Sequence, residues 1–77
     1  MYYVPNGDNF GKNLCRVRRS KGLTRLKLAA LVDISIFELI DIENGVQRKI
    51  PAELVTRFCE QLDTDIETLF ANVNIIH

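Results

Sequence analysis

The sequence predicts an all-α fold, a compact bundle of five short helices, on the strength of three observations. Apolar residues recur at steps of three and four in five separate segments. Residues that favour helix starts and stops, such as serine, threonine, proline and glycine, stand between these segments. The 77 residues, of which 47% are hydrophobic, are enough for one domain with one modest core.

The first two helices are predicted from their apolar spacing and their end signals. Residues 8–20 place three apolar residues at steps of four and three, which indicates an amphipathic helix: Phe10, Leu14 and Val17. Gly22 suits the left-handed residue that follows a helix, and Thr24 then caps a second helix that runs to about Val32. The expected inward face of this second helix consists of Leu28, Ala29 and Leu31.

The third helix is predicted over residues 35–45. Ser35 followed by Glu38 is a capping box, and Asn44-Gly45 supplies a left-handed stop. On such a helix one side carries Leu39 and Ile42, and the other carries Phe37, Ile40 and Asp41. Only Asp33 and Ile34 separate the second and third helices, so we expect a helix-turn-helix with a steep crossing angle.

Two further helices complete the predicted bundle. Pro51 suits the first turn of a fourth helix, whose apolar face is Leu54, Val55, Phe58, Cys59 and Leu62. Thr64 with Glu67 predicts a second capping box, at the start of a short fifth helix that carries Ile66, Leu69 and Phe70. We divide the chain into an N-terminal arm at residues 1–7, a helix-turn-helix domain at 8–71 and a C-terminal tail at 72–77. The apolar arm is interpreted either as disordered or as packed on a neighbour.

Several classes of protein are disfavoured by composition. The chain has no run of about 18 apolar residues and no basic segment followed by an apolar signal core, so we expect neither a membrane-spanning nor a secreted protein, but a cytoplasmic one. Cys15 and Cys59 lack partners at metal-ligand spacing. They are interpreted as reduced thiols in or near the core, and we expect no metal and no cofactor.

The charge is balanced overall and uneven along the chain. Residues 1–32 carry seven positive and one negative side chain, and residues 33–77 carry three positive and nine negative ones. The basic cluster consists of Lys12, Arg16, Arg18, Arg19, Lys21, Arg25 and Lys27. Such a segment suits phosphates, although a polar helix face can also be simply solvated or paired with the acidic half.

Residues spread along almost the whole chain carry a resemblance to a known family. They are Gly22-Leu23-Thr24, Leu28-Ala29, Ile34-Ser35, Leu39, Ile42-Glu43-Asn44-Gly45, Leu62, Ile66 and Leu69. In this combination the chain resembles the Cro and phage-repressor helix-turn-helix family, also called the xenobiotic-response-element family. The resemblance implies a lambda-repressor-like DNA-binding domain, in which the second helix crosses the DNA backbone and the third enters the major groove, usually in a homodimer.

The resemblance also implies roles for individual residues. Arg18 and Glu43 match a structural ion pair between the first and third helices. Asn44 matches a position that touches a phosphate, and Arg25 stands where the family often has a glutamine at the start of the second helix. The full set of expected phosphate contacts is Lys12, Arg16, Arg19, Arg25, Lys27, Asn44, Arg48 and Lys49.

The residues of the third helix that would face the DNA bases depart from the family pattern. The base-facing positions of the third helix hold Ile36, Phe37, Glu38 and Asp41, where many members have Ser, Gln, Arg, Thr or Lys. Isoleucine and phenylalanine offer only apolar contact to a thymine methyl, and a carboxylate can accept from cytosine but is repelled by nearby phosphates. Asp33 also replaces a glycine of the turn, which an aspartate tolerates in a left-handed conformation at a small cost.

Two functions therefore remain open. The first is a sequence-specific regulator, expected to act as a repressor, that binds double-stranded DNA. The second is a protein-binding module of the same fold, in which exposed Ile36, Phe37 and Ile40 anchor a partner. For either, we expect a homodimer whose contact involves the terminal arms and the fifth helix, unless these apolar ends are simply frayed.

An enzyme is not expected. The single histidine is the last residue, His77, and Ser35 has no base near it in sequence. Asp41 and Glu43 lie two positions apart on a helix, so their carboxylates point in different directions.

Overall fold

The computed structural model describes residues 1–75, which form five helices and four two-residue strands. In chain order these are β1 (Tyr2–Tyr3), β2 (Pro5–Asn6), α1 (Asn9–Ser20), α2 (Arg25–Leu31), α3 (Ile36–Glu43), β3 (Ile50–Pro51), α4 (Ala52–Leu62), α5 (Ile66–Leu69) and β4 (Asn74–Ile75). Ile76 and His77, which belong to the apolar C-terminal end and the terminal histidine of the sequence analysis, lie outside the described residues.

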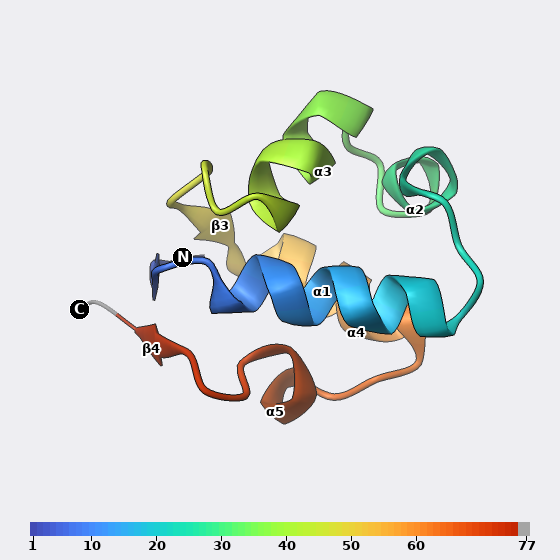
Figure 1. Cartoon of the computed structure of the whole chain (residues 1–77). Coiled ribbons are helices and arrows are strands. Elements are labelled where there is room, and N and C mark those ends of the chain that lie inside the picture. The colour runs from blue at the N-terminus through green and yellow to red at the C-terminus, as the bar shows by residue number, and fades with distance from the viewer. Residues whose placement is uncertain (76–77) are drawn as a thin grey trace.

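Helix α1 crosses the centre of the molecule and is covered on several sides. α3 packs on one side of it and α5 on the other, with α4 behind it (Figure 1). The buried apolar side chains come from all five helices and from β3, because each helix turns its apolar stripe inward. They are Phe10, Leu14, Val17, Leu28, Ala29, Val32, Leu39, Ile42, Ile50, Leu54, Val55, Phe58, Leu62 and Leu69.

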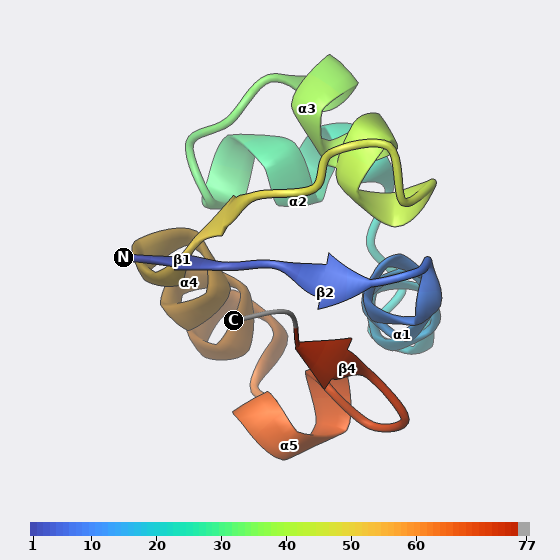
Figure 2. The same ribbon diagram turned by 90° about the vertical axis from the view of Figure 1, so that its left-hand side faces the viewer.

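The all-α prediction is correct for the five helices and misses the short strands. β1 pairs antiparallel with β3, joining Tyr2 to Pro51, and β2 pairs antiparallel with β4, joining Pro5 to Ile75. The N-terminal arm thus runs between β3 and β4, and its two strands pair with other parts of the same chain (Figure 2). The interpretation of the arm as disordered is therefore wrong. Strands of two residues are too short to show an alternating pattern in the sequence.

The start signal of the second helix acts as predicted, and that of the third helix does so only in part. Thr24 Oγ1 accepts from the backbone N–H of Lys27 at 3.1 Å, and Ser35 Oγ accepts from that of Glu38 at 3.0 Å. The Glu38 carboxylate, which the predicted capping box turns back to the helix start, instead accepts from Gln47 Nε2 at 3.2 Å. The prediction for the fifth helix is wrong in its capping residue. Asp65, not Thr64, is the N-cap, and its Oδ1 accepts from the backbone N–H of Thr68 at 2.8 Å.

The connections adopt the expected left-handed conformations. Gly22 and Gly45 have φ of 72° and 75°, and Asp33 in the α2–α3 turn has φ of 60°. The predicted inward face of α2 is wrong at one residue. Leu31 is 39% exposed, whereas Val32, the residue that ends α2, is fully buried.

No helix within residues 1–75 is both long and apolar enough to cross a membrane.

Candidate nucleic-acid interface

A buried ion pair joins α1 to α3. Arg18 Nε donates to Glu43 Oε2 at 2.7 Å and Arg18 Nη2 donates to Glu43 Oε1 at 3.2 Å, so the guanidinium grips both carboxylate oxygens. Each residue is only 5% exposed. Arg18 Nη1 also donates to the carbonyl of Leu23 at 2.7 Å, which ties the α1–α2 loop to the same group. The pair implied by the family resemblance is therefore present and holds three segments together.

A second arginine extends this pair into a cluster. Arg25 Nε, at the start of α2, donates to Glu43 Oε1 at 2.7 Å, while the Arg25 side chain stays 37% exposed. Burial raises the pKa of Glu43, but hydrogen bonds from Arg18 and Arg25 outweigh it, so the net pKa lies below its ordinary value. The hydrogen bond to Glu43 in turn raises the pKa of Arg18, against the effect of burial. Glu43 thus fixes Arg25 at the rim of the interface.

A basic pocket lies between α1 and the ends of α2 and α3. It has a volume of about 330 Å³ and is lined by Lys12, Cys15, Arg16, Arg19, Arg25, Glu43 and Asn44. Five of the eight expected phosphate contacts are therefore brought together, from α1, from α2 and from Asn44, which follows the last residue of α3. Four cationic side chains face a single carboxylate that Arg18 and Arg25 already bind, so the pocket favours an anion.

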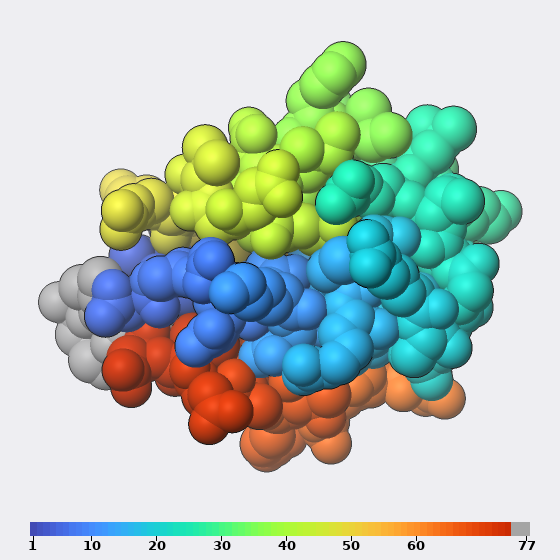
Figure 3. Space-filling view, in the orientation of Figure 1, coloured from blue at the N-terminus to red at the C-terminus, as the bar shows by residue number. Residues whose placement is uncertain are grey.

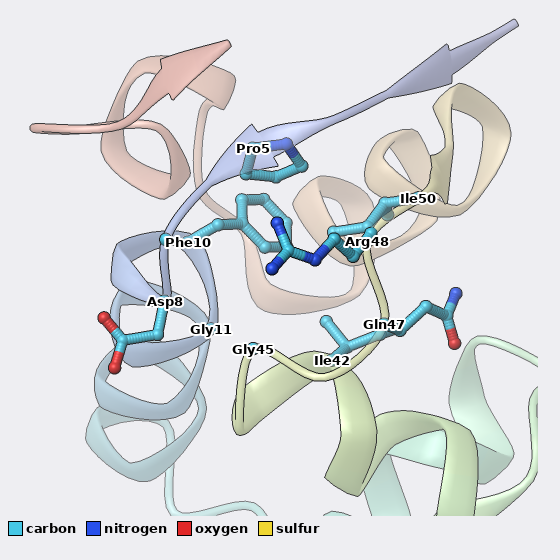
Figure 4. Close-up of a pocket in the computed structure, with 10 residues that line it drawn as sticks. Pro5, Asp8, Phe10, Gly11, Ile42, Gly45, Gln47, Arg48 and Ile50 are labelled. Atoms are coloured by element: carbon cyan, nitrogen blue, oxygen red, sulfur yellow. The ribbon is translucent and has the colours of Figure 1, made fainter. Parts of the chain in front are cut away.

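The other three expected phosphate contacts do not line this pocket. Lys27 and Lys49 are exposed elsewhere on the surface. Arg48 belongs to a second hollow of about 260 Å³ beside the N-terminal segment, and its side chain runs back toward Phe10 (Figure 4). The remaining lining residues of this hollow are Pro5, Gly7, Asp8, Gly11, Ile42, Gly45, Gln47 and Ile50.

The base-facing positions of α3 differ in exposure. Phe37 is 74% exposed and Asp41 is exposed, whereas Ile36 and Glu38 are half-buried. Ile36 packs against the core, and Ile40 is also half-buried. The expected patch of three exposed apolar residues is thus wrong for Ile36 and Ile40, because the short helix lies close to its neighbours and turns these side chains partly inward.

The surface of α1 is accessible between the other helices. In the space-filling view it lies between α2 and α3 on one side and α5 with the C-terminal strand on the other (Figure 3). The basic pocket opens where α1 meets the ends of α2 and α3.

Comparison with known proteins identifies the fold and the family. The profile of the helix-turn-helix domain family matches residues 11–75. The chain belongs to this helix-turn-helix family. The resemblance to Cro and phage-repressor proteins that the sequence carries is confirmed by this match and by similar structures. No curated protein matches the chain in a sequence search.

Several solved structures share the fold of this helix-turn-helix domain. The restriction-modification controller protein C.AhdI from Aeromonas hydrophila is 25% identical, with a TM-score of 0.76, over 82% of this chain and 94% of that one. The clp gene regulator ClgR from Corynebacterium glutamicum is 25% identical, with a TM-score of 0.77, over 82% of this chain and 66% of that one. The N-terminal DNA-binding domain of SinR from Bacillus subtilis, at 22% identity and a TM-score of 0.75, covers 83% and 93%.

The helix-turn-helix domain contains a buried polar residue beside the basic pocket, Asn13, that the sequence analysis missed. Asn13 is buried, and its Nδ2 donates to the carbonyls of Leu69 and Ala71 at 2.9 and 2.8 Å. Its Oδ1 accepts from Arg16 Nη2 at 2.9 Å and so orients that arginine at the basic pocket. A signal was available, because Asn13 lies three residues after Phe10 on the apolar side of α1.

Gln47 is a second residue that the sequence analysis missed. Its side-chain nitrogen donates to Glu38 Oε2 at 3.2 Å and to the carbonyl of Lys49 at 3.0 Å. No spacing in the sequence indicates this contact, since Gln47 lies in a loop outside any periodic segment.

Proposed function

We propose that the protein is a sequence-specific DNA-binding transcriptional regulator that acts as a repressor. The observation that carries the proposal is the basic pocket, which gathers cations from α1 and α2 with Asn44 beside the end of α3. DNA phosphates suit such a site, and a phosphate held there lies next to the helix whose outer face presents Phe37 and Asp41. Among the similar structures, SinR has a DNA-binding domain and ClgR is a gene regulator, which supports the assignment.

In this proposal, affinity comes mainly from phosphate contacts. The contacts inside the basic pocket are Lys12, Arg16, Arg19, Arg25 and Asn44, and the flanking ones are Lys27, Arg48 and Lys49. Arg48 lines the hollow beside Phe10, so in this proposal its side chain must turn outward to meet a phosphate. Cations of this kind release condensed counterions when they bind, so binding should weaken steeply as salt rises.

Specificity comes from α3 and is limited in kind. Phe37 and Ile36 would contact thymine methyl groups, while Glu38 and Asp41 would accept from the amino group of cytosine. One such helix covers only a few base pairs, so we propose a homodimer on a near-palindromic site. Light scattering at micromolar concentration tests this, and a monomer bound to a single half-site would contradict it.

A non-enzymatic role and a cytoplasmic location are part of the same proposal. The Ser35 hydroxyl already serves as a helix cap, and the Glu43 carboxylate is held by two arginines. Neither side chain is therefore disposed for nucleophilic or acid–base work.

The decisive experiment is selection of duplexes from a random-sequence pool, followed by affinity measurement at several salt concentrations. We expect an enriched near-palindrome that binds far more tightly than bulk DNA. Arg19→Gln should weaken binding to all sequences and reduce the slope of log affinity against log salt by about 1. The control is Lys21→Gln, which removes an exposed cation from the end of α1 that does not line the basic pocket. Equal slopes for the two variants would contradict the role of the basic pocket.

A protein-binding module is the second candidate, favoured by one observation. Phe37 is 74% exposed at the outer surface of α3, and an exposed aromatic residue is a common anchor at interfaces. Absence of DNA binding even at low salt would favour this function and would direct the search for a partner to α3.

A further inference from the structure

Gln47 is held firmly in the loop that follows α3. Its backbone N–H donates to the carbonyl of Asp41 at 3.2 Å. Its side-chain amide donates to Glu38 Oε2 and to the carbonyl of Lys49. Both partners are pure acceptors, so the amide nitrogen, and not the amide oxygen, must face them.

The chain path explains why this loop residue meets α3. Gly45 turns the chain back with a φ of 75°, and the backbone N–H of Val46 donates to the carbonyl of Asp41 at 2.8 Å. The loop therefore lies against the last turns of α3. The Gln47 side chain extends away from Phe10 and Arg48 (Figure 4), and its contact with Glu38 lies one helical turn before Asp41.

We propose that Gln47 is a positioning residue for Glu38, and that Glu38 reads a cytosine in the major groove. This inference rests on the proposed DNA-binding function and names the base that α3 selects. Gln47 binds Oε2 of Glu38, which leaves Oε1 as the oxygen that would accept from the N4 amino group of cytosine. Adenine also offers an amino group, but its neighbouring N7 is an acceptor and repels a carboxylate.

The tether answers the electrostatic problem of a carboxylate near DNA. An unrestrained glutamate would rotate away from the phosphates and lose its base contact. The amide of Gln47 holds the carboxylate in place and replaces part of the water that it loses on binding. Gln47 itself does not need to touch DNA for this effect.

The experiment compares base preference among variants, using the duplex selected by the wild-type protein. Glu38→Gln should change the preferred base at one position of each half-site from cytosine to adenine, because glutamine pairs with adenine N6 and N7. This change identifies the base pair that residue 38 reads. Duplexes with each of the four bases at that pair then serve as probes.

The test of Gln47 is a loss of preference at that pair alone. Gln47→Leu should reduce the discrimination for cytosine by about fivefold. The loss is modest because Glu38 makes a single acceptor contact with the base, which contributes less discrimination than a bidentate pair. Gln47→Glu, which replaces the donor with a second carboxylate, should do the same or more. Gln61→Leu removes an exposed glutamine from α4 and is the matched control, with unchanged preference expected.

A double substitution separates positioning from a structural role. In a Glu38→Ala background, Gln47→Leu should cause no further loss of discrimination, because its effect acts through Glu38. Unchanged cytosine preference in both Gln47 variants, with specific DNA binding retained, would overturn this inference and leave the proposed function intact. Failure of the wild-type protein to bind any duplex would overturn both.

Discussion

Helix α3 has two sides with charged residues. One side crosses α1 and carries a buried ion pair, and the other is the outer face, where the charged side chain is exposed to solvent. At the crossing, Arg18 and Glu43 are 5% exposed and share two hydrogen bonds. On the outer face, Asp41 and Phe37 are exposed to solvent. Removal of a group from the crossing should therefore cost stability, whereas removal from the outer face should cost binding and leave the fold intact.

The same contrast exists between two ion pairs of α1. Lys12 and Asp8 lie 3.3 Å apart with side chains 67% and 54% exposed, so water and salt screen their attraction. Arg18 and Glu43 have exchanged nearly all of their water for each other. Removing one partner of a buried pair of this kind lowers the stability of the fold, because the remaining charge is buried away from water.

The largest expected effect is that of Arg18→Met. The substitution leaves the buried Glu43 with Arg25 as its remaining cation, and we expect a loss of about 3 kcal/mol in the free energy of unfolding. Lys12→Met, at the exposed pair, should change it by less than about 0.5 kcal/mol. Urea denaturation measures both. Similar losses for the two variants would remove the distinction between the buried and exposed pairs.

A steric effect of somewhat smaller size is expected at the same crossing. A Cβ at Gly11 would overlap the backbone carbonyl oxygens of Ile42 and Glu43, which cannot move as a flexible side chain could. Gly11→Ala should thus destabilise by about 2 kcal/mol, despite the helix propensity of alanine. Ser20→Ala, at an exposed position of the same helix, is the comparison. A more stable Gly11→Ala variant in thermal unfolding would contradict the close approach of α1 and α3.

The ion cluster also predicts a dependence of stability on pH. The pKa of Glu43 in the folded state lies below its ordinary value of 4.5. The contribution of the Glu43 carboxylate to the free energy of unfolding is therefore complete above pH 4.5. As pH falls further, the unfolded chain takes up the proton first, and the contribution is lost as pH passes through the folded pKa. In Glu43→Gln the melting temperature should fall less steeply over this window. Parallel curves for wild type and variant would show that Glu43 does not titrate as the cluster requires.

The smallest expected effect on stability belongs to the outer face. Phe37→Ala removes an exposed ring, and we expect the free energy of unfolding to stay within about 0.5 kcal/mol of wild type. On DNA the same variant should lose its preference for thymine at one position, because the methyl contact is gone. A large loss of stability would mean that the ring packs on the domain.

Local signals in the sequence predicted much of the fold. Thr24 and Ser35 mark the starts of α2 and α3 because a helix start needs an acceptor within three residues. At the fifth helix the predicted cap, Thr64, was wrong by one residue, because the adjacent Asp65 also has a side-chain acceptor and is the residue that caps the helix. The two-residue strands gave no periodic signal at all.

The candidate site was predicted less completely. The sequence placed most of the basic residues on the first two helices and in the loop after the third, and the family resemblance paired Arg18 with Glu43. Neither indicated that Arg25 shares the same carboxylate, that Asn13 orients Arg16, or that Gln47 holds Glu38. The spacing of Asn13 on the apolar side of α1 marks it as buried, but no periodic pattern indicates which partner a polar residue contacts.

The sequence by itself determined where the five helices lie, because helix starts, stops and apolar spacing depend on neighbours within a few residues. Which residues at the edges of each apolar face are buried, such as Val32 in place of Leu31, was decided by the packing. The tertiary structure alone decided which charges meet. Arg18 and Arg25 lie 25 and 18 positions from Glu43, and only the packing of α1 and α2 against α3 brings them to one carboxylate. Burial then makes that contact strong, since water no longer competes for the charges.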